Sequence, residues 1–282
     1  MRLLLRLVDS LALLDMLLAF GEVAGHAPAG RPYCRPLVLE GGGRLSVTQG
    51  RHPLLDARPD SACQPNDTDM DQEEACLHLI TGPNMAGKST YLKQVALLVV
   101  MAQAGCLVPA AAMAFRPFTR LFTRMGTGDS IETNASSFMM EMQEVANILD
   151  HADSHSLVLV DELGRATSTS DGVALAWAVC EELLRCRVLA LFATHFQQLE
   201  ALTLTYSHAR LWRLMVNAAP QHLDFTWQLK GGRQAPLPPH YGLTLAASLG
   251  FPPPLLERAR RLVPARPLLH LTTPYHLTVC QI

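Results

Sequence analysis

The chain contains three largely apolar runs that are separated by segments with helical spacing. The runs cover residues 77–80, 157–160 and 188–193. A short run without regular polar alternation is typical of a central strand in a parallel sheet, because both faces of such a strand are covered. Between the runs, apolar residues recur at intervals of three and four, which predicts helices. The predicted helices cover residues 90–100, 137–150 and 171–184. This alternation predicts an α/β fold with a mostly parallel sheet flanked by helices.

Weaker signals extend this pattern in both directions. Short strands are expected at residues 37–39, 45–47 and 121–123. Residues 223–229 alternate between apolar and polar side chains, which predicts a half-exposed edge strand. Two short helices are expected at 241–250 and 254–262. The polar segment 56–74 is rich in proline and acidic residues, and we expect an exposed loop there.

The start of the chain is rich in leucine, and the spacing predicts an amphipathic helix. Its apolar stripe consists of Leu3, Leu4, Leu7, Val8, Leu11, Leu14 and Leu18. Asp9 and Asp15 interrupt the stretch, which argues against the apolar core of a signal peptide. No period is visible near the C-terminus. We therefore expect a leading helix with its connection over residues 1–32, a folded domain over 33–262 and an unpatterned tail over 263–282.

Composition narrows the class of protein. The 282 residues are 49% hydrophobic, which is ample for a buried core. The formal net charge of −2 gives no excess of basic residues for direct binding of nucleic acid. The seven cysteines include no C-x-x-C pair, and their odd number favours a reducing intracellular compartment. Residues 95–115 are almost wholly apolar, but Gln103, Gly105 and Pro109 favour a buried helix followed by a loop over a membrane span.

A phosphate-binding motif follows the first apolar run. It consists of Gly82, Pro83, Asn84, Met85, Ala86, Gly87, Lys88, Ser89 and Thr90, which fit the G-x-x-x-x-G-K-[ST] spacing. Such a loop presents backbone N–H groups to nucleotide phosphates at a helix N-terminus, whose dipole also favours anions. Lys88 is expected to reach the β- and γ-phosphates, and the Ser89 hydroxyl to bind Mg2+. The alternative, a glycine turn with an incidental lysine, is weakened by the strand and helix on either side. The motif predicts that the chain binds a nucleoside triphosphate.

A pair of acidic residues follows the second apolar run. Asp161 and Glu162 end the predicted strand, so we expect their carboxylates at the carboxyl edge of the sheet, beside the phosphate loop. Asp161 is expected to hold Mg2+, usually through water, and Glu162 to orient and polarise the attacking water. An aspartate at a strand end also suits an ordinary helix N-cap. The phosphate loop upstream favours the catalytic interpretation.

A histidine follows the third apolar run. His195 comes directly after Thr194, and we expect it at the same sheet edge as Asp161. There its ring would contact the γ-phosphate or the attacking water. A single histidine is more often structural, and that alternative stays open.

Together these motifs resemble the C-terminal ATPase domain of the MutS family, the DNA mismatch-recognition clamps. The phosphate loop with Thr81 resembles the family's TGPNM-x-GKST, residues 161–169 resemble its DELGRGTST, and residues 192–196 contain its FATH segment. The segments Arg51-His52-Pro53 and His240-Tyr241-Gly242 match further landmarks. The resemblance covers roughly residues 10–262.

Within the family, residues 129–139 are most similar to the eukaryotic meiotic branch, particularly the fourth MutS homologue. This branch implies a nuclear protein that acts in crossover formation, whereas the wider family implies mismatch repair. DNA contact is then expected mainly through other domains of the full-length assembly. Of the domains that precede this one in the family, only the last lever-like helix is matched. The dimerisation element expected after Arg260 is also unmatched, so we expect a truncated product or a partial gene model.

The resemblance implies a P-loop NTPase of the ABC-ATPase class that uses ATP and Mg2+ and releases ADP and phosphate. It also implies that the chain works as half of a dimer with a second MutS-type subunit, a heterodimer rather than a homodimer, with each ATP between two subunits. Ser136 matches the signature serine that faces the partner's nucleotide, although it also suits an N-cap of the next helix. Asp171 matches the segment that links the two sites. Nucleotide binding and dimerisation would then be thermodynamically coupled.

The unmatched dimerisation element and a departure at Ala166 favour a second hypothesis, because a composite site without a partner should hydrolyse ATP slowly. Ala166 replaces a glycine, and an alanine that had to adopt a positive φ would strain the loop by about 1 kcal/mol. The family's adenine-contacting segment is poorly matched in residues 59–67, so no adenine contact is predicted. The second hypothesis is a non-catalytic, truncated fragment that binds ATP without efficient turnover. A transporter nucleotide-binding domain and a small GTPase are disfavoured, because the sequence has no LSGGQ-type signature and no NKxD motif.

Overall fold

The computed structural model describes residues 2–25, 27–28, 30–58, 63–126, 137–219, 222–232 and 241–262. These residues fall into two compact units. The first, Met1–Val216 with Phe225–Ala235, contains the four-stranded sheet and most of the six-stranded sheet. The second contains the helices α7 (Tyr241–Ser248) and α8 (Pro253–Leu262), which pack on each other. The two short helices predicted near the C-terminus are therefore confirmed, while the predicted tail lies outside the described residues.

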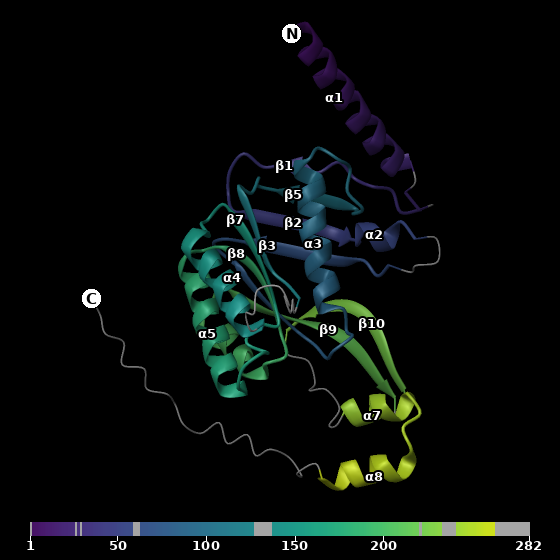
Figure 1. The fold of residues 1–282 in the computed structure, drawn as a ribbon, viewed down its shortest axis with the longest axis vertical. Helices are drawn as coiled ribbons and strands as arrows, with labels where there is room; N and C mark the ends of the chain where they lie inside the picture. The colour runs from purple at the N-terminus through teal and green to yellow at the C-terminus, as the bar shows by residue number, and fades with distance from the viewer. Residues whose placement is uncertain are drawn as a thin grey trace, which may run out of the picture. The chain divides into compact units, whose positions relative to one another are not determined.

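The larger sheet has six strands in the order β10-β9-β4-β8-β7-β6 (Figure 1). The strands are β4 (Leu77–Thr81), β6 (Arg120–Arg124), β7 (Ser156–Asp161), β8 (Leu189–Thr194), β9 (Ala209–Ala219) and β10 (His222–Gly231). β4 pairs in parallel with β8 and β9, and β7 pairs in parallel with β6 and β8. The mostly parallel sheet predicted from the apolar runs is confirmed, with β10 at its edge as expected.

Burial explains why the apolar runs form the centre of this sheet. Every residue of β4 and β8 is buried, and in β7 only Asp161 at the carboxyl end is partly exposed. Three helices pack on the strands: α3 (Lys88–Gln103) on β7 and β8, α4 (Ser137–His151) on β6, and α5 (Thr169–Arg185) on β4 and β8. The predicted helices are thus confirmed to within a few residues at each end.

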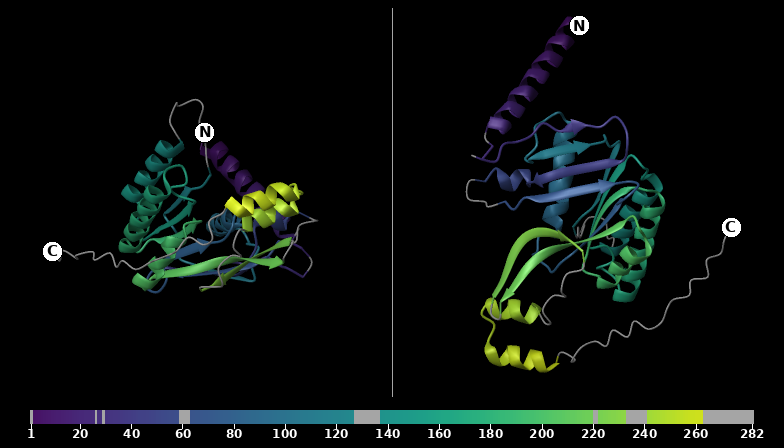
Figure 2. Two further views of the ribbon diagram at one scale, coloured as in Figure 1. Left: turned by 90° about the horizontal axis from the view of Figure 1, so that it is seen from below. Right: turned by 180° about the vertical axis from the view of Figure 1, so that it is seen from behind.

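A second sheet has four strands in the order β1-β5-β2-β3. Its strands are β1 (Leu37–Val38), β2 (Arg44–Gly50), β3 (Asn66–Asp71) and β5 (Ala112–Phe115). β2 pairs antiparallel with both β3 and β5. Helix α3 also contacts β2, so this helix packs against strands of both sheets (Figure 2).

The exposed loop predicted over residues 56–74 is wrong for part of its length, because β3 lies within it. Asn66, Thr68 and Met70 are buried and alternate with exposed residues. Two of these three side chains are polar, so the hydrophobic pattern conceals the strand. The Thr68 hydroxyl is hydrogen-bonded to the Tyr91 hydroxyl at 2.8 Å, which satisfies one of these buried groups. β5 likewise forms where a loop was expected, and β9 was not predicted.

Helix α1 (Arg2–Gly25) confirms the predicted leading helix and extends it. Its large apolar residues are exposed, including Leu5, Leu13 and Leu17, which lie outside the predicted stripe. The helix is therefore apolar on more than one face. Within the part of the chain that the structure describes, no helix is long and apolar enough to cross a membrane. Three short helices complete this part: α2 (Pro53–Asp56), the 3-10 helix η1 (Gln197–Ala201) and α6 (Leu202–Thr205).

Candidate functional site

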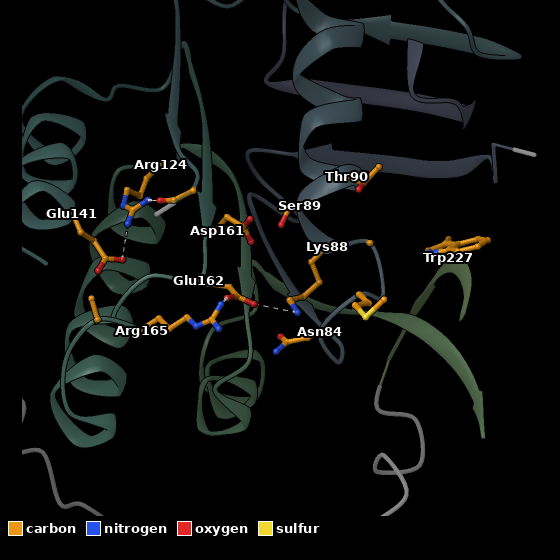
Figure 3. A pocket seen from close by; sticks show the side chains of 14 residues that line it. Asn84, Lys88, Ser89, Thr90, Arg124, Glu141, Asp161, Glu162, Arg165 and Trp227 are labelled. Atoms are coloured by element: carbon orange, nitrogen blue, oxygen red, sulfur yellow. Dashed lines mark hydrogen bonds and ion pairs between the residues drawn. The ribbon is translucent and has the colours of Figure 1, made fainter. Parts of the chain in front are cut away.

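One pocket of about 820 Å3 lies at the carboxyl edge of the larger sheet (Figure 3). Since β4 and β7 both pair in parallel with β8, the segments that follow them meet at this edge. The predicted residues in its wall are Asn84, Met85, Gly87, Lys88, Ser89, Thr90, Asp161 and Glu162. The structure therefore brings the predicted phosphate loop and the predicted acidic pair together. Gly82, Pro83 and Ala86 belong to the loop but do not line the pocket.

The loop turns sharply into α3. Gly87 precedes the helix with a φ of +97°, and a Cβ atom there would lie 3.1 Å from Cδ1 of Trp227. Met85 has a φ of +68°, which is uncommon for a residue with a side chain. The first N–H groups of an α-helix have no acceptor within the helix, so the N-terminus of α3 favours an anion in the pocket.

Lys88 places a buried positive charge between the loop and the acidic pair. Its Nζ donates hydrogen bonds to the carbonyl oxygens of Gly82 at 2.9 Å and Pro83 at 3.2 Å. The same atom lies 3.5 Å from Oε1 of Glu162. The charge is thus held at the floor of the pocket, where it attracts anionic groups.

Glu162 is held from several sides. Its backbone has a φ of +53°, and its N–H donates to the Ala193 carbonyl of β8 at 2.9 Å. Its Oε2 accepts a hydrogen bond from Nη1 of Arg165 at 2.7 Å. Burial raises the pKa of the Glu162 carboxyl, but the Lys88 and Arg165 charges outweigh burial and hold that pKa below its ordinary value. The carboxylate is therefore ionised at neutral pH and acts as an acceptor.

Asp161 offers an oxygen atom that has no partner. Its Oδ1 is buried and accepts no hydrogen bond in the described structure. Burial raises the pKa of this carboxyl, a hydrogen bond with the Ser89 side chain lowers it, and the neighbouring Glu162 raises it again. The net shift is upward. A carboxylate oxygen beside a hydroxyl is a donor set that hard divalent cations prefer, so these two side chains fit the predicted Mg2+ ligands.

His195 lies beside the pocket and is not part of its wall. The residue is exposed, and its ring centroid is 4.2 Å from that of Phe196. Partial burial lowers the pKa of His195, Glu162 raises it, and Lys88 and Arg165 lower it further. The net pKa is below its ordinary value, so the ring is neutral at pH 7. Contact of this ring with a phosphate or with attacking water stays a prediction.

Asp171, which was predicted to link the two sites of a dimer, does not line the pocket. Asp171 lies exposed in the first turn of α5, where its N–H donates to the Ser168 hydroxyl at 3.2 Å. Its link to a second site stays a prediction. Ser136 lies outside the described residues, as does His240.

Arg124 and Glu141 are wall residues that the motifs did not predict. They form a buried ion pair, with 3.2 Å between Nη2 and Oε1. Weak signals for both were present in the sequence. Arg124 directly follows the predicted strand 121–123 and therefore ends at the same sheet edge as Asp161. Glu141 shares a helix face with Val145, four residues later, which is buried.

Trp227 enters the wall from β10. The alternating pattern placed it on the buried face of the strand, but its side chain is 51% exposed. Its φ of +52° breaks the regular alternation. Asn66 of β3 holds the strand there, because its Nδ2 donates to the Trp227 carbonyl at 2.9 Å and its Oδ1 accepts from the Leu229 N–H at 2.7 Å. Trp227 also borders a second pocket of about 390 Å3 that includes His52 and Gln64.

The condition for strain at Ala166, a positive φ, is not met. In the turn after the acidic pair, Gly164 has the positive φ, at +82°, and Ala166 does not adopt a positive φ. A Cβ atom on Gly164 would lie 2.7 Å from Cα of Gly172, so the turn packs backbone to backbone against the start of α5. A side chain is excluded at Gly164 and tolerated at Ala166, which lines the pocket.

The chain is similar to known proteins over most of its length. It is 42% identical over 255 residues to a protein named DNA mismatch repair protein MSH4 from Arabidopsis thaliana. That match covers 90% of this chain and 31% of the relative. Two proteins named DNA mismatch repair protein MutS, from Ruminiclostridium cellulolyticum and Protochlamydia amoebophila, are 40% and 39% identical. These matches cover 90% and 92% of this chain and 29% and 30% of the relatives.

This chain therefore spans less than a third of the length of these relatives. Residues 78–265 match the family model of MutS domain V, which is well over half of the chain. The matched segment includes the phosphate loop, the acidic pair and His195. The chain accordingly belongs to the MutS family, and its sequence is similar to that of MSH4.

Proposed function

We propose that this chain is an ATP-binding and ATP-hydrolysing module of a MutS-type DNA clamp. It would be a P-loop NTPase of the ABC-ATPase class that requires Mg2+ and converts ATP and water to ADP and phosphate. The observation that carries the proposal is the single pocket in which the Lys88 ammonium, the unpartnered Asp161 oxygen and the Glu162 carboxylate converge (Figure 3).

Ser89 and Asp161 are the side chains that would hold Mg2+. The unpartnered, buried Oδ1 supports this assignment, because an unsatisfied buried acceptor costs about 1–3 kcal/mol. Bound Mg2+ would neutralise charge on the phosphate oxygens.

The remaining steps fall to groups of the chain itself. The N–H groups at the start of α3 and the Lys88 ammonium would bind the phosphates. Glu162, ionised at neutral pH, would accept a hydrogen bond from the attacking water and take its proton as the oxygen bonds to the γ-phosphorus. The bond from phosphorus to the bridging oxygen breaks, and ADP leaves. His195 would stabilise the γ-phosphate or the water from the rim.

The adenine base of ATP would lie toward Trp227. The half-exposed indole of Trp227 stands over Gly87 at the end of the phosphate loop and borders both pockets. A flat aromatic side chain at this place suits a nucleobase, since stacking of a base on an aromatic ring is worth about 1–3 kcal/mol. Trp227 is therefore our candidate for the adenine contact that the sequence did not assign.

At the level of the assembly, we propose that the chain works as half of a dimer with a second MutS-type subunit, preferably a heterodimer. Ser136 would face the partner's nucleotide, and Asp171 would link the two sites. The similarity to MSH4 supports a nuclear protein in meiotic crossover formation, and the similarity to MutS proteins supports mismatch repair. DNA would be contacted mainly by other parts of the assembly.

The alternative, a fragment that binds ATP without efficient turnover, has lost one of its supports because Ala166 is not strained. Steady-state phosphate release by the Glu162→Gln variant, with and without a MutS-type partner, separates the two. We expect Mg2+–ATP binding to be retained and turnover to fall by about 100-fold or more. Glu73→Gln is the matched control, because the Glu73 side chain is 85% exposed.

Each outcome of this experiment has a distinct meaning. Wild-type protein that binds Mg2+–ATP but does not turn it over with any partner supports the alternative. Turnover that is the same in Glu162→Gln and wild type rejects the role of Glu162. Wild-type protein that fails to bind Mg2+–ATP rejects the proposed function altogether.

A further inference from the structure

A single carboxylate oxygen in the pocket wall makes two contacts with different elements. Oε1 of Glu141 lies 3.2 Å from Nη2 of Arg124 and accepts a hydrogen bond from the Gly164 N–H at 3.1 Å. The Glu141 side chain is 2% exposed and that of Arg124 is 8% exposed. Contacts to a charged acceptor that is shielded from water are stronger than those on the surface. Glu141 is therefore a firm anchor for the backbone of Gly164.

The anchored backbone belongs to the turn that carries Glu162. That turn is held at one side by the hydrogen bond from the Glu162 N–H to Ala193, and at another by the contact of Gly164 with Gly172. Glu162 itself has a φ of +53°, which an isolated turn would not favour. The hydrogen bond from Gly164 to Glu141 is a third constraint, on the side of the turn that faces α4.

Arg124 ties this anchor to the sheet. It is the last residue of β6 and pairs in register with Val160, which directly precedes Asp161. Its Nε lies 3.2 Å from Oε2 of Glu144, whose side chain is 50% exposed. Arg124 thus neutralises the buried Glu141 and fixes it relative to the strand that carries the acidic pair. Glu144 shares the arginine but does not reach the turn.

We propose that Glu141, held by Arg124, is a positioning residue that fixes the Glu162–Gly164 turn for hydrolysis. The inference rests on the proposed function, because its kinetic consequence requires that Glu162 acts on the attacking water. Glu141 does not touch the reacting atoms. Its loss displaces the Glu162 carboxylate and so affects turnover more than nucleotide binding.

The test compares three variants of the full 282-residue chain with the wild type. Glu141→Ala removes the acceptor, Glu141→Gln keeps an oxygen for the Gly164 N–H, and Glu144→Gln removes only the exposed partner of Arg124. Small misplacements of catalytic groups cost up to about 100-fold in rate, so we expect kcat to fall about 10- to 100-fold in Glu141→Ala. We expect the Kd for a slowly hydrolysed ATP analogue to stay close to that of the wild type. Glu141→Gln should retain more kcat than Glu141→Ala, and Glu144→Gln should match the wild type.

Hydrogen exchange of the Gly164 amide, read by NMR without nucleotide, tests the contact independently of catalysis. We expect faster exchange in Glu141→Ala and unchanged exchange in Glu144→Gln. If the wild type has no ATPase activity with or without a MutS-type partner, the proposed hydrolysis fails, while the exchange measurement still decides whether Glu141 anchors the turn. Unchanged exchange and unchanged kcat in Glu141→Ala would overturn the inference, as would an equal loss of kcat and binding. If Glu141→Ala does not fold, the same comparison is made with Glu141→Gln, whose neutral oxygen is a weaker acceptor than the carboxylate. Gly164 exchange that is faster than in Glu144→Gln, with a lower kcat and an unchanged Kd, would support the anchor, and exchange and kcat that match the wild type would contradict it.

Discussion

His78 makes the stability of the larger sheet depend on pH. It lies in the central strand β4, is 1% exposed, and neither of its ring nitrogens has a hydrogen-bond partner in the described structure. Burial, with a smaller effect from the Arg210 guanidinium, lowers the pKa of His78 from 6.5 to about 3. The backbone of Asp69 raises this pKa, but by less than burial lowers it. The perturbation we consider is His78→Leu, which replaces the titratable imidazole with an apolar side chain of similar size.

The magnitude follows from the two pKa values. Near pH 7 the ring is mostly neutral in both the folded and the unfolded chain, so its protonation contributes little to the free energy of unfolding. Below the unfolded pKa of 6.5, the unfolded chain takes up a proton that the folded chain does not accept until about pH 3. The free energy of unfolding therefore falls as pH falls, by about 1.4 kcal/mol per pH unit in this window. Between pH 7 and pH 5 the loss amounts to about 2 kcal/mol.

Urea denaturation, followed by circular dichroism, measures this loss directly. At pH 7 we expect His78→Leu to be more stable than wild type by about 1 kcal/mol, because two unpaired buried polar atoms are removed. At pH 5 we expect the difference to grow by about 2 kcal/mol. His155→Leu is the control, since the His155 side chain is exposed and its replacement removes no buried group. A difference between His78→Leu and wild type that is the same at both pH values would refute the reasoning.

Two further predictions concern the pocket and its turn. Trp227→Ala should weaken binding of a fluorescent ATP analogue about tenfold or more, while Trp227→Phe keeps part of the affinity; equal affinities in wild type and Trp227→Ala would remove Trp227 from the base site. Gly164→Ala should lower the free energy of unfolding by about 2 kcal/mol or more, for two reasons. The alanine would have to adopt a positive φ, and its Cβ atom would clash with the backbone of Gly172. Gly105→Ala also has a positive φ but no atom within 4 Å, so urea denaturation should find a loss of only about 1 kcal/mol there, and equal losses would contradict the steric argument.

The parts of the fold that the sequence predicted are those in which burial follows a simple pattern. The strands β4, β7 and β8 are continuous apolar runs because both faces of the sheet are covered. Parallel pairing then fixes which ends of these strands meet. For that reason Lys88 and Asp161 could be placed in one pocket from the sequence, although they are far apart along the chain.

The parts that the sequence did not predict depend on contacts between distant polar side chains. β3 buries Asn66 and Thr68, which read as loop residues until their partners are known. The position of Trp227 depends on the two hydrogen bonds of Asn66, which no local pattern encodes. Glu141 reads as an ordinary helical glutamate, and its role at Gly164 emerges only from the packing of α4 beside the turn.

We propose that Lys88 and Asp161 together hold a metal-bound triphosphate. Isothermal titration of the wild type, Lys88→Ala and Asp161→Asn with a slowly hydrolysed ATP analogue, with Mg2+ and with a chelator, tests it most directly. We predict that the wild type binds more tightly with Mg2+, that Asp161→Asn loses this Mg2+ dependence, and that Lys88→Ala binds weakly under both conditions. Binding by both variants that matches the wild type, with the same response to Mg2+, would contradict the account.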